Sequence, residues 1–287
     1  MAIKPEYAVT RFPTPLFKTP DIATQFGGED GDTLALDDKG LLRSAETVLF
    51  PKSKLIVIDR IAGVLKVRTT EYPYGDFYAD ERFLSLRQDE PEERKKTLPE
   101  MLNIIKNLKE MEHFPYIWGG NWPKGIDEMT QFYPSRTVFH ELKLNIRDIW
   151  RFRGCDCTGL PYYLTNGVTP RNSSSLVTYG KPVNIEGLTA EGIIERLESM
   201  DFIVWDGHLV WVLDPEHCIE SRYPFGLIKT KLTDRLAEIM EQKRPVNDWT
   251  HTNGERFVVR RWHPDNISSS DNNNPSFNNN KPSLPAF

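Results

Sequence analysis

The first third of the chain alternates short apolar runs with turn residues, a pattern typical of β-strands. Residues 47–50, 55–58 and 64–67 are rich in β-forming side chains and are separated by proline, serine or glycine. Residues 65–68 alternate apolar and polar positions, as a strand with one buried face does. Several short strands in a segment of this size predict a small β-barrel over residues 5–85.

A second pattern begins after a charged stretch at residues 86–97, which predicts a solvated linker. Apolar residues then recur at spacings of three and four, with lysine and glutamate on the opposite side. This periodicity predicts an amphipathic helix that ends before Pro115. Its expected apolar face consists of Leu98, Met101, Leu102, Ile105, Leu108 and Met111.

The rest of the chain mixes helix and strand patterns. Residues 188–200 and 232–243 have helical periodicity, residues 202–213 resemble two strands around a turn at Asp206-Gly207, and residues 256–262 resemble a final strand. These patterns predict an α+β fold.

The predicted domains are 1–88, the small barrel, and 89–265, a second domain with the linker and helix at its start. Residues 266–287 hold seven asparagines and almost no aliphatic residues, so we expect a disordered tail.

Composition narrows the function. The chain has 36 Lys and Arg against 41 Asp and Glu, a net charge of -5, which disfavours a nucleic-acid partner. The longest aliphatic run, residues 55–58, is far short of the roughly 20 residues of a membrane span. The first residues lack the apolar stretch of a secretory leader. We therefore expect a soluble monomer in the cytoplasm, or in the periplasm if a leader is missing from the sequence.

The three cysteines do not form a disulfide framework. Their number is odd and Cys155 and Cys157 are one residue apart, which suits a reducing compartment. Cys155 and Cys218 are expected to be buried thiols. A zinc site formed by the cysteines and His217 is disfavoured because the spacing is unusual, so no metal or cofactor is expected.

Cys157 lies in a sequence context that favours nucleophilic chemistry. A cysteine attacks carbonyl carbons as the thiolate, which a helix N-terminus and a histidine partner stabilise. Residues 156–159 have the small and capping side chains of a loop that enters a helix, and Pro161 suits a first helical turn. We expect Cys157 at the positive end of that helix, with nearby backbone N–H groups free to bind an oxyanion.

His208 is the expected partner of Cys157. It follows a glycine at the start of an apolar strand, a rigid place for an imidazole. Glu220 lies on the next strand, at a spacing that brings it back beside His208, where it would orient the ring. His217 is the one rival base, but it lacks the context of a glycine followed by a strand.

These segments carry a family resemblance. Tyr-x-Trp-Gly-Gly at 116–120, Asp-Cys-Thr-Gly-Leu at 156–160, Gly-His at 207–208 and Ile-x-Ser at 219–221 together resemble the NlpC/P60 cysteine peptidases. The resemblance covers roughly residues 100–222 and implies a papain-like catalytic domain. It implies that Cys157 is the nucleophile, His208 the base and Glu220 the third residue.

The resemblance also implies a substrate. Family members with a barrel before the peptidase domain hydrolyse the bond between γ-D-glutamate and a diamino acid such as diaminopimelate. Their substrates are peptidoglycan stem peptides with a free N-terminal L-alanine, released in wall turnover or muropeptide recycling. Pro170, Arg171 and Ser173 match the family's Pro-Arg-x-Ser stretch, and the N-terminal barrel resembles a bacterial SH3-type domain. The implied substrate residues are Asp156, which would hold the peptide amine, with Thr158, Trp118, Ser173, Glu46 and Tyr72.

The sequence departs from the family at three places. Glu220 replaces the usual histidine and Thr158 the usual serine. An insertion at residues 121–154 contains aromatic side chains that could reshape the mouth of the cleft: Phe132, Tyr133, Phe139 and Trp150. Two other functions stay open. One is an amidase or acyltransferase that uses the same Cys-His core, and the other is a non-catalytic wall-binding protein.

Overall fold

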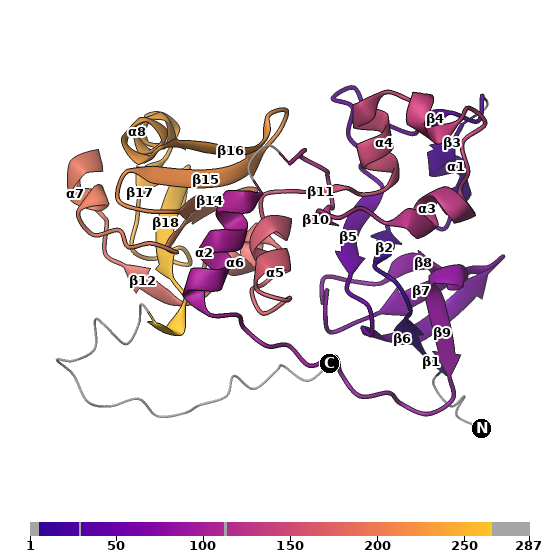
Figure 1. Ribbon diagram of the computed structural model, residues 1–287. Coiled ribbons are helices and arrows are strands. Elements are labelled where there is room, and N and C mark those ends of the chain that lie inside the picture. The colour runs from indigo at the N-terminus through magenta and orange to yellow at the C-terminus, as the bar shows by residue number, and fades with distance from the viewer. Residues whose placement is uncertain (1–5, 29, 112–113, 266–287) are drawn as a thin grey trace.

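The structure is a computed structural model that describes residues 6–28, 30–111 and 114–265. Within those residues the fold is mixed α/β and contains two seven-stranded sheets, one in an N-terminal and one in a C-terminal unit. The two units lie side by side and the short strands β10 and β11 run between them (Figure 1). The predicted tail at 266–287 lies outside the described residues.

The N-terminal sheet is antiparallel, with the order β5-β2-β8-β7-β6-β1-β9. The strands predicted at 47–50, 55–58 and 64–67 are confirmed as β5, β6 and β7. In the described part of the chain β5 and β9 end the sheet and do not pair with each other, so no closed barrel forms. The SH3-like domain therefore stays a prediction. The strands are β1 Glu6–Thr10, β2 Thr14–Phe17, β5 Ala45–Leu49, β6 Lys54–Ile61, β7 Val64–Arg68, β8 Phe77–Asp80 and β9 Leu84–Arg87.

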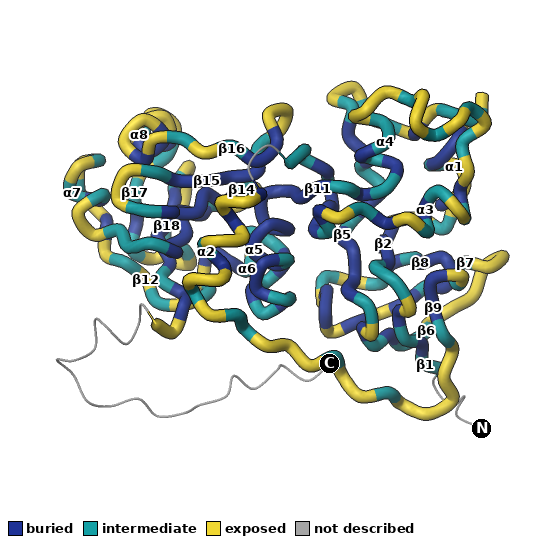
Figure 2. Tube along the Cα trace, viewed as in Figure 1, coloured by how far each residue is buried: buried dark blue, intermediate teal, exposed yellow. Residues whose placement is uncertain are grey.

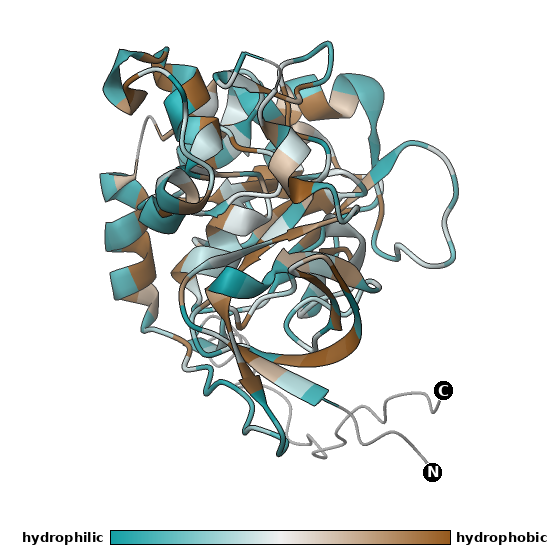
Figure 3. Ribbon diagram, turned by 90° about the vertical axis from the view of Figure 1, so that its right-hand side faces the viewer, coloured by the Kyte–Doolittle hydropathy of each residue, from teal (hydrophilic) through white to brown (hydrophobic). Residues whose placement is uncertain are grey.

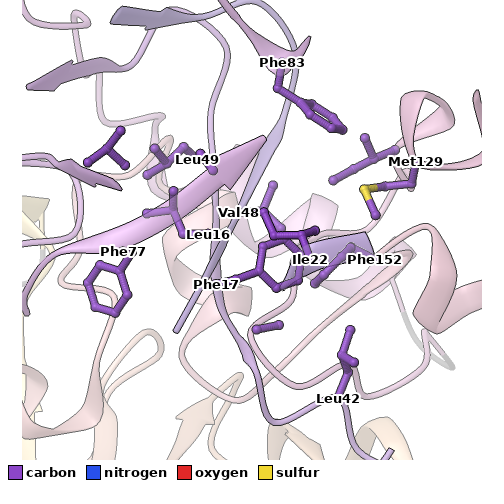
Figure 4. Packing of buried hydrophobic residues seen from close by; sticks show 14 of the residues in the cluster. Leu16, Phe17, Ile22, Leu42, Val48, Leu49, Phe77, Phe83, Met129 and Phe152 are labelled. Carbon is purple, nitrogen blue, oxygen red and sulfur yellow. The ribbon is translucent and has the colours of Figure 1, made fainter. Parts of the chain in front are cut away.

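The insertion at residues 121–154 packs on the N-terminal sheet. Trp150 and Phe152 are fully buried, and Phe152 lies 6.1 Å from Phe17 of β2, ring centre to ring centre. Figure 4 shows Met129 and Phe152 beside Phe17 and Val48 of the sheet. The elements here are α1 Ile22–Gln25, β3 Phe26–Gly27, β4 Thr33–Leu34, β10 Asn121–Trp122, α3 Asp127–Phe132, α4 Leu144–Trp150 and β11 Gly154–Cys155.

The aromatic residues of the insertion therefore complete a core. Tyr133 stacks on Phe26 at 5.2 Å, and the indole N–H of Trp150 donates to the Tyr133 carbonyl at 2.9 Å. Phe132 and Phe139 pack against the same cluster. The expectation that these side chains reshape the cleft is wrong, because the N-terminal sheet needs an apolar cover and the insertion supplies it. In Figure 3, where the N-terminal unit faces the viewer, hydrophobic residues lie along its strands and polar residues in its loops.

The C-terminal sheet has the order β12-β18-β13-β14-β15-β16, with β17 paired to β18. Both faces are buried, which explains the unbroken apolar runs: Phe202 and Val204 pack on one side, and Ile203 between them packs on the other. Helices α2 and α5 cover the first face, α7 and α8 the second. The strands are β12 Lys181–Val183, β13 Phe202–Trp205, β14 His208–Val212, β15 His217–Arg222, β16 Gly226–Lys231, β17 Arg244–Pro245 and β18 Arg256–Arg261. The helices are α2 Met101–Glu110, α5 Gly159–Leu164, α6 Ser173–Leu176, α7 Ala190–Ile194 and α8 Leu232–Gln242.

The hairpin at Asp206-Gly207, helix α8 and strand β18 confirm the sequence pattern. The helix predicted over 188–200 is the short α7. Helix α2 exists, but its predicted face is partly wrong: Leu102 is 74% exposed and Ile104 is fully buried. Ile104 and Leu108, four residues apart, define the stripe that packs with the buried Leu160 of α5.

The charged segment before α2 has no regular secondary structure, as predicted, and much of it is exposed (Figure 2). Arg94 is the exception to the prediction of a solvated linker, because its side chain is buried. Its buried guanidinium pairs with Glu71 at 3.0 Å and donates to the Asn166 side chain at 2.8 Å, which fixes the segment between the two units. Among the described helices, none is long and apolar enough to cross a bilayer.

Candidate active site

The loop that carries Cys157 is fixed by close backbone contact with the Trp118-Gly119-Gly120 segment. The Asp156 N–H donates to the Gly120 carbonyl at 2.9 Å. A Cβ atom on Gly159 would lie 2.0 Å from that carbonyl oxygen, so the start of α5 can approach it only as glycine. Helix α5 begins at Gly159, with Pro161 in its first turn, as predicted.

Asp156 caps this helix. Its Oδ1 accepts the N–H groups of Thr158 at 3.1 Å and Gly159 at 2.7 Å. The expectation that these two N–H groups are free for an oxyanion is therefore wrong. The N–H of Cys157 has no hydrogen-bond partner in residues 6–28, 30–111 and 114–265 and is the backbone donor that remains.

Arg171 holds the other side of Asp156. Its Nη1 donates to Oδ1 at 2.9 Å and its Nη2 to Oδ2 at 2.6 Å, and Arg171 is only 3% exposed. Arg171 was visible in the sequence as part of the Pro-Arg-x-Ser stretch, but its partner was not. Its role here is to neutralise and orient the carboxylate next to Cys157.

The structure brings Cys157, His208 and Glu220 together. His208 begins β14, directly after the turn, and Glu220 lies in the buried centre of β15. The imidazole Nε2 lies 2.5 Å from Glu220 Oε2, which leaves Nδ1 for the Cys157 thiol. The Cys157 Sγ also lies 4.0 Å from the Gly207 carbonyl oxygen, one residue before His208.

The electrostatics of His208 favour its charged form. Burial acts to lower the pKa of His208, but its hydrogen bonds to Cys157 and Glu220 outweigh burial and raise the pKa to about 9. Burial acts to raise the pKa of Glu220, yet the hydrogen bonds from His208 and Arg235 hold it below its ordinary value. The pair is therefore an imidazolium next to a carboxylate at neutral pH.

Arg235 of α8 is a site residue that the sequence analysis missed. Its Nε donates to Glu220 Oε1 at 2.6 Å and its Nη2 to Oε2 at 3.0 Å. The sequence signal that could have revealed this role is the position of Arg235 in the helical pattern of α8. Arg235 lies within the apolar face formed by Leu232, Leu236 and Ile239, where a charged side chain needs a buried partner.

A pocket of about 230 Å³ opens at Cys157. Tyr72 donates to Glu46 Oε2 at 2.8 Å, and the Ser173 hydroxyl accepts the Gly207 N–H at 2.9 Å. Arg43 lies 3.9 Å above the Trp118 ring centre. The pocket walls include Cys157 and all the residues predicted for substrate: Glu46, Tyr72, Trp118, Asp156, Thr158 and Ser173.

Tyr116 lines the same pocket. The sequence alone does not decide between packing and substrate contact for Tyr116. Its hydroxyl has no hydrogen-bond partner in the described part of the chain. Burial, together with the nearby Asp156 and Cys157, raises the pKa of Tyr116 well above its ordinary value, so the phenol stays protonated and can donate.

The other thiols and the rival histidine lie outside this pocket. Cys155 is 3% exposed and Cys218 is fully buried, and burial raises the pKa of both, that of Cys218 to about 11. His217 pairs with Asp214 at 2.9 Å. Within the described chain no group of three or more His, Cys, Asp or Glu side chains could hold a metal ion.

No family model and no curated protein matches the chain. Three solved structures of NlpC/P60 proteins resemble it at low identity. An NlpC/P60 family protein from Bacillus cereus ATCC 10987 is 15% identical over 91% of this chain and 64% of that protein, with a TM-score of 0.35. NlpC2 from Trichomonas vaginalis is 11% identical over 89% of this chain and 72% of its own, with a TM-score of 0.32. NlpC1 from Trichomonas vaginalis is 10% identical over 90% and 69%, with a TM-score of 0.33. The chain thus spans less than two thirds of the Bacillus protein, and its function has to be argued from the site itself.

Proposed function

We propose that this chain is a cysteine peptidase of the NlpC/P60 type, acting on peptidoglycan stem peptides in wall turnover in the cytoplasm. The proposed scissile bond joins γ-D-glutamate to diaminopimelate in peptides with a free N-terminal L-alanine. One observation carries the proposal: His208, whose Nε2 lies 2.5 Å from Glu220 Oε2, also interacts with Cys157, and Cys157 and Gly207 line a pocket with polar and aromatic residues. A buried imidazole between a thiol and a carboxylate is the arrangement of a nucleophile with its base.

The proposed reaction starts from a Cys157 thiolate beside the protonated His208. The Cys157 sulfur attacks the peptide carbonyl carbon, and His208 gives its proton to the leaving amine. The acyl group is left as a thioester on Cys157, which water hydrolyses with His208 as base. The Cys157 N–H and the Tyr116 hydroxyl are the donors available to the oxyanion.

The substrate amine needs an anionic partner, and the contacts favour Glu46 over Asp156. Both oxygens of Asp156 already accept from Arg171, and Oδ1 also caps α5. Glu46 accepts from the Tyr72 hydroxyl and pairs with a half-exposed cation: Lys18, 49% exposed, at 2.9 Å. A substrate ammonium that takes the place of Lys18 would exchange one surface ion pair for another at small cost.

The test compares Cys157→Ala with Cys155→Ala. The probe is L-Ala-γ-D-Glu-meso-diaminopimelate, and products are identified by mass spectrometry. Cys157→Ala should abolish release of diaminopimelate while far-UV circular dichroism stays native. Cys155→Ala, which removes a buried thiol two residues away, should retain turnover. Equal turnover by wild type and Cys157→Ala would refute the proposal.

The alternative reactions are decided in the same assay. Intact peptidoglycan and a lipid ester are added as parallel substrates. Processing of the ester alone would assign the Cys157-His208 core to an acyltransferase. Among the described residues the pocket walls contain none of 121–154, so the insertion does not favour that alternative.

A further inference from the structure

A second ion pair lies behind His208. Arg235 of α8 donates two hydrogen bonds to the Glu220 carboxylate, at 2.6 and 3.0 Å, and both side chains are buried. Its remaining nitrogen, Nη1, lies 3.0 Å from Glu238, at the exposed end of the network. His208, Glu220 and Arg235 thus form one row of hydrogen-bonded side chains that begins beside Cys157.

We infer that Arg235 is a positioning residue for this row: its planar guanidinium holds Glu220 at the orientation in which Glu220 fixes His208 against Cys157. The inference rests on the proposed cysteine-hydrolase function. It extends the apparatus to α8, beyond residues 100–222, which carry the family resemblance.

The geometry explains why a guanidinium is needed. A carboxylate has free rotation about its last bond, and a single contact to His208 leaves one oxygen without a partner in the core. The two parallel N–H groups of Arg235 fix both oxygens at once, which a lysine ammonium cannot do.

Ionisable groups from three elements face Glu220. Glu220 faces His208 from β14, Arg235 from α8 and, on its own strand, the Cys218 thiol, which is protonated because burial raises its pKa. The Trp205 ring lies 5.2 Å from the His208 ring and 5.9 Å from the Arg235 guanidinium carbon. Among the residues that the structure describes, Arg235 is the one cation that contacts Glu220 besides the imidazole of His208.

The experiment measures Arg235→Met against Arg222→Met. Arg222 is a matched control because it also pairs with Glu238, at 3.1 Å, but has no hydrogen bond to Glu220 or His208 in the described chain. Arg235→Met should lower kcat/KM about 100-fold, mainly in kcat, the size expected when catalytic groups shift by about 1 Å. Arg222→Met should stay within about 2-fold of wild type, the range of a surface ion pair.

A readout that does not depend on the substrate is the rate of Cys157 alkylation by iodoacetamide against pH. The inflection that reports loss of the His208 proton is expected near pH 9 in the native protein. Below that inflection the alkylation rate should fall in Arg235→Met, because His208 is no longer held against Cys157. A rate equal to that of wild type below the inflection would overturn the inference. A normal profile in wild type without peptide cleavage would instead reject the proposed substrate and leave the inference standing.

Two further variants separate positioning from stability. Arg235→Lys keeps the positive charge and the fold but loses the two parallel N–H donors. Its kcat should therefore lie between that of Arg235→Met and that of wild type. In a Glu220→Gln background, Arg235→Met should cost less than about 3-fold, because residues that act as a unit are not additive. Full additivity, or full recovery by lysine, would show that Arg235 contributes charge or stability alone and would contradict positioning.

Discussion

Arg171 links the Cys157 loop to the N-terminal sheet. Its Nη2 donates to Asp156 at 2.6 Å, while its Nε donates to the Thr47 hydroxyl of β5 at 3.0 Å. The Asn121 side chain makes a parallel connection, since its Oδ1 accepts the Thr47 hydroxyl at 3.1 Å. The residue next to Cys157 is therefore oriented by contacts that exist only when both units are folded.

Arg171→Met should destabilise the protein strongly. The change leaves Asp156 buried and charged without its cation, a situation that costs about 3–5 kcal/mol. The free energy of unfolding in urea measures this. Arg68→Met is the control, because Arg68 pairs with Asp76 at 2.7 Å but is 61% exposed, and should cost less than about 1 kcal/mol. Equal losses in the two variants would contradict the assigned role of Arg171.

Stability should depend on pH through His208. Its pKa is raised to about 9 in the folded protein, above the ordinary 6.5, so the folded state binds this proton more tightly. The resulting stabilisation is full below pH 6.5, declines as pH rises and is lost above about pH 9. Its size is about 3 kcal/mol at most, at 1.36 kcal/mol for each unit of pKa difference. Glu220 stays ionised throughout this range because its pKa is lowered, and it adds no slope.

The measurement is the free energy of unfolding of wild type and His208→Gln between pH 6 and 10. The difference between the two proteins isolates His208 from other titrating groups. It should shrink as pH rises across this window. A difference that stays constant would mean that the imidazole is not charged in the folded state.

The parts of the site that the sequence could predict are local. A glycine, a proline and capping residues within 156–161 determine the turn into α5, and Asp206-Gly207 determines the hairpin that starts at His208. In such segments the chain neighbours themselves fix the backbone, so spacing alone places Cys157 and His208. The position of Glu220 beside His208 could be predicted because β14 and β15 are adjacent antiparallel strands.

The parts that could not be predicted depend on pairing between distant segments. Arg235 meets Glu220 only because α8 packs across β15, and the apolar periodicity of α8 gives no partner for an arginine. The exposed Leu102 shows the same limit. The periodicity of α2 allows more than one apolar face, and only packing against α5 determines which face is buried. The aromatic residues of 121–154 likewise could cover either the cleft or the N-terminal sheet.

Trp150→Ala tests the insertion as part of the N-terminal core. Trp150 is fully buried, 6.0 Å from Phe26, and its loss should cost about 3–5 kcal/mol, the range for large aromatic residues in cores. Leu144→Ala, at the start of the same helix and 63% exposed, should change the free energy of unfolding by less than about 0.5 kcal/mol. Urea denaturation monitored by far-UV circular dichroism measures both. A small effect at Trp150 would mean that the insertion is not part of the core.

The recognition of the peptide amine can be tested at Glu46 and Lys18. Glu46→Gln keeps the shape of the side chain and the hydrogen bond with Tyr72 but removes the negative charge. A hydrogen bond to a charged group contributes about 1.5–3 kcal/mol, so KM for the free tripeptide should rise by about 10-fold or more, with kcat little changed. Because the N-acetylated tripeptide lacks the N-terminal ammonium, its turnover should not respond to the substitution.

Lys18→Met gives the opposite expectation. Lys18 occupies Glu46 Oε1 at 2.9 Å in the free protein, and a substrate ammonium would have to displace it. Removing Lys18 should therefore lower KM for the free tripeptide, by a few-fold at most because the pair is half exposed to solvent. Steady-state kinetics of Glu46→Gln and Lys18→Met with the free and the N-acetylated tripeptide test whether Glu46 binds the peptide amine. If Lys18→Met raised KM instead, Lys18 itself would be binding the substrate, and the amine would have to lie elsewhere in the pocket.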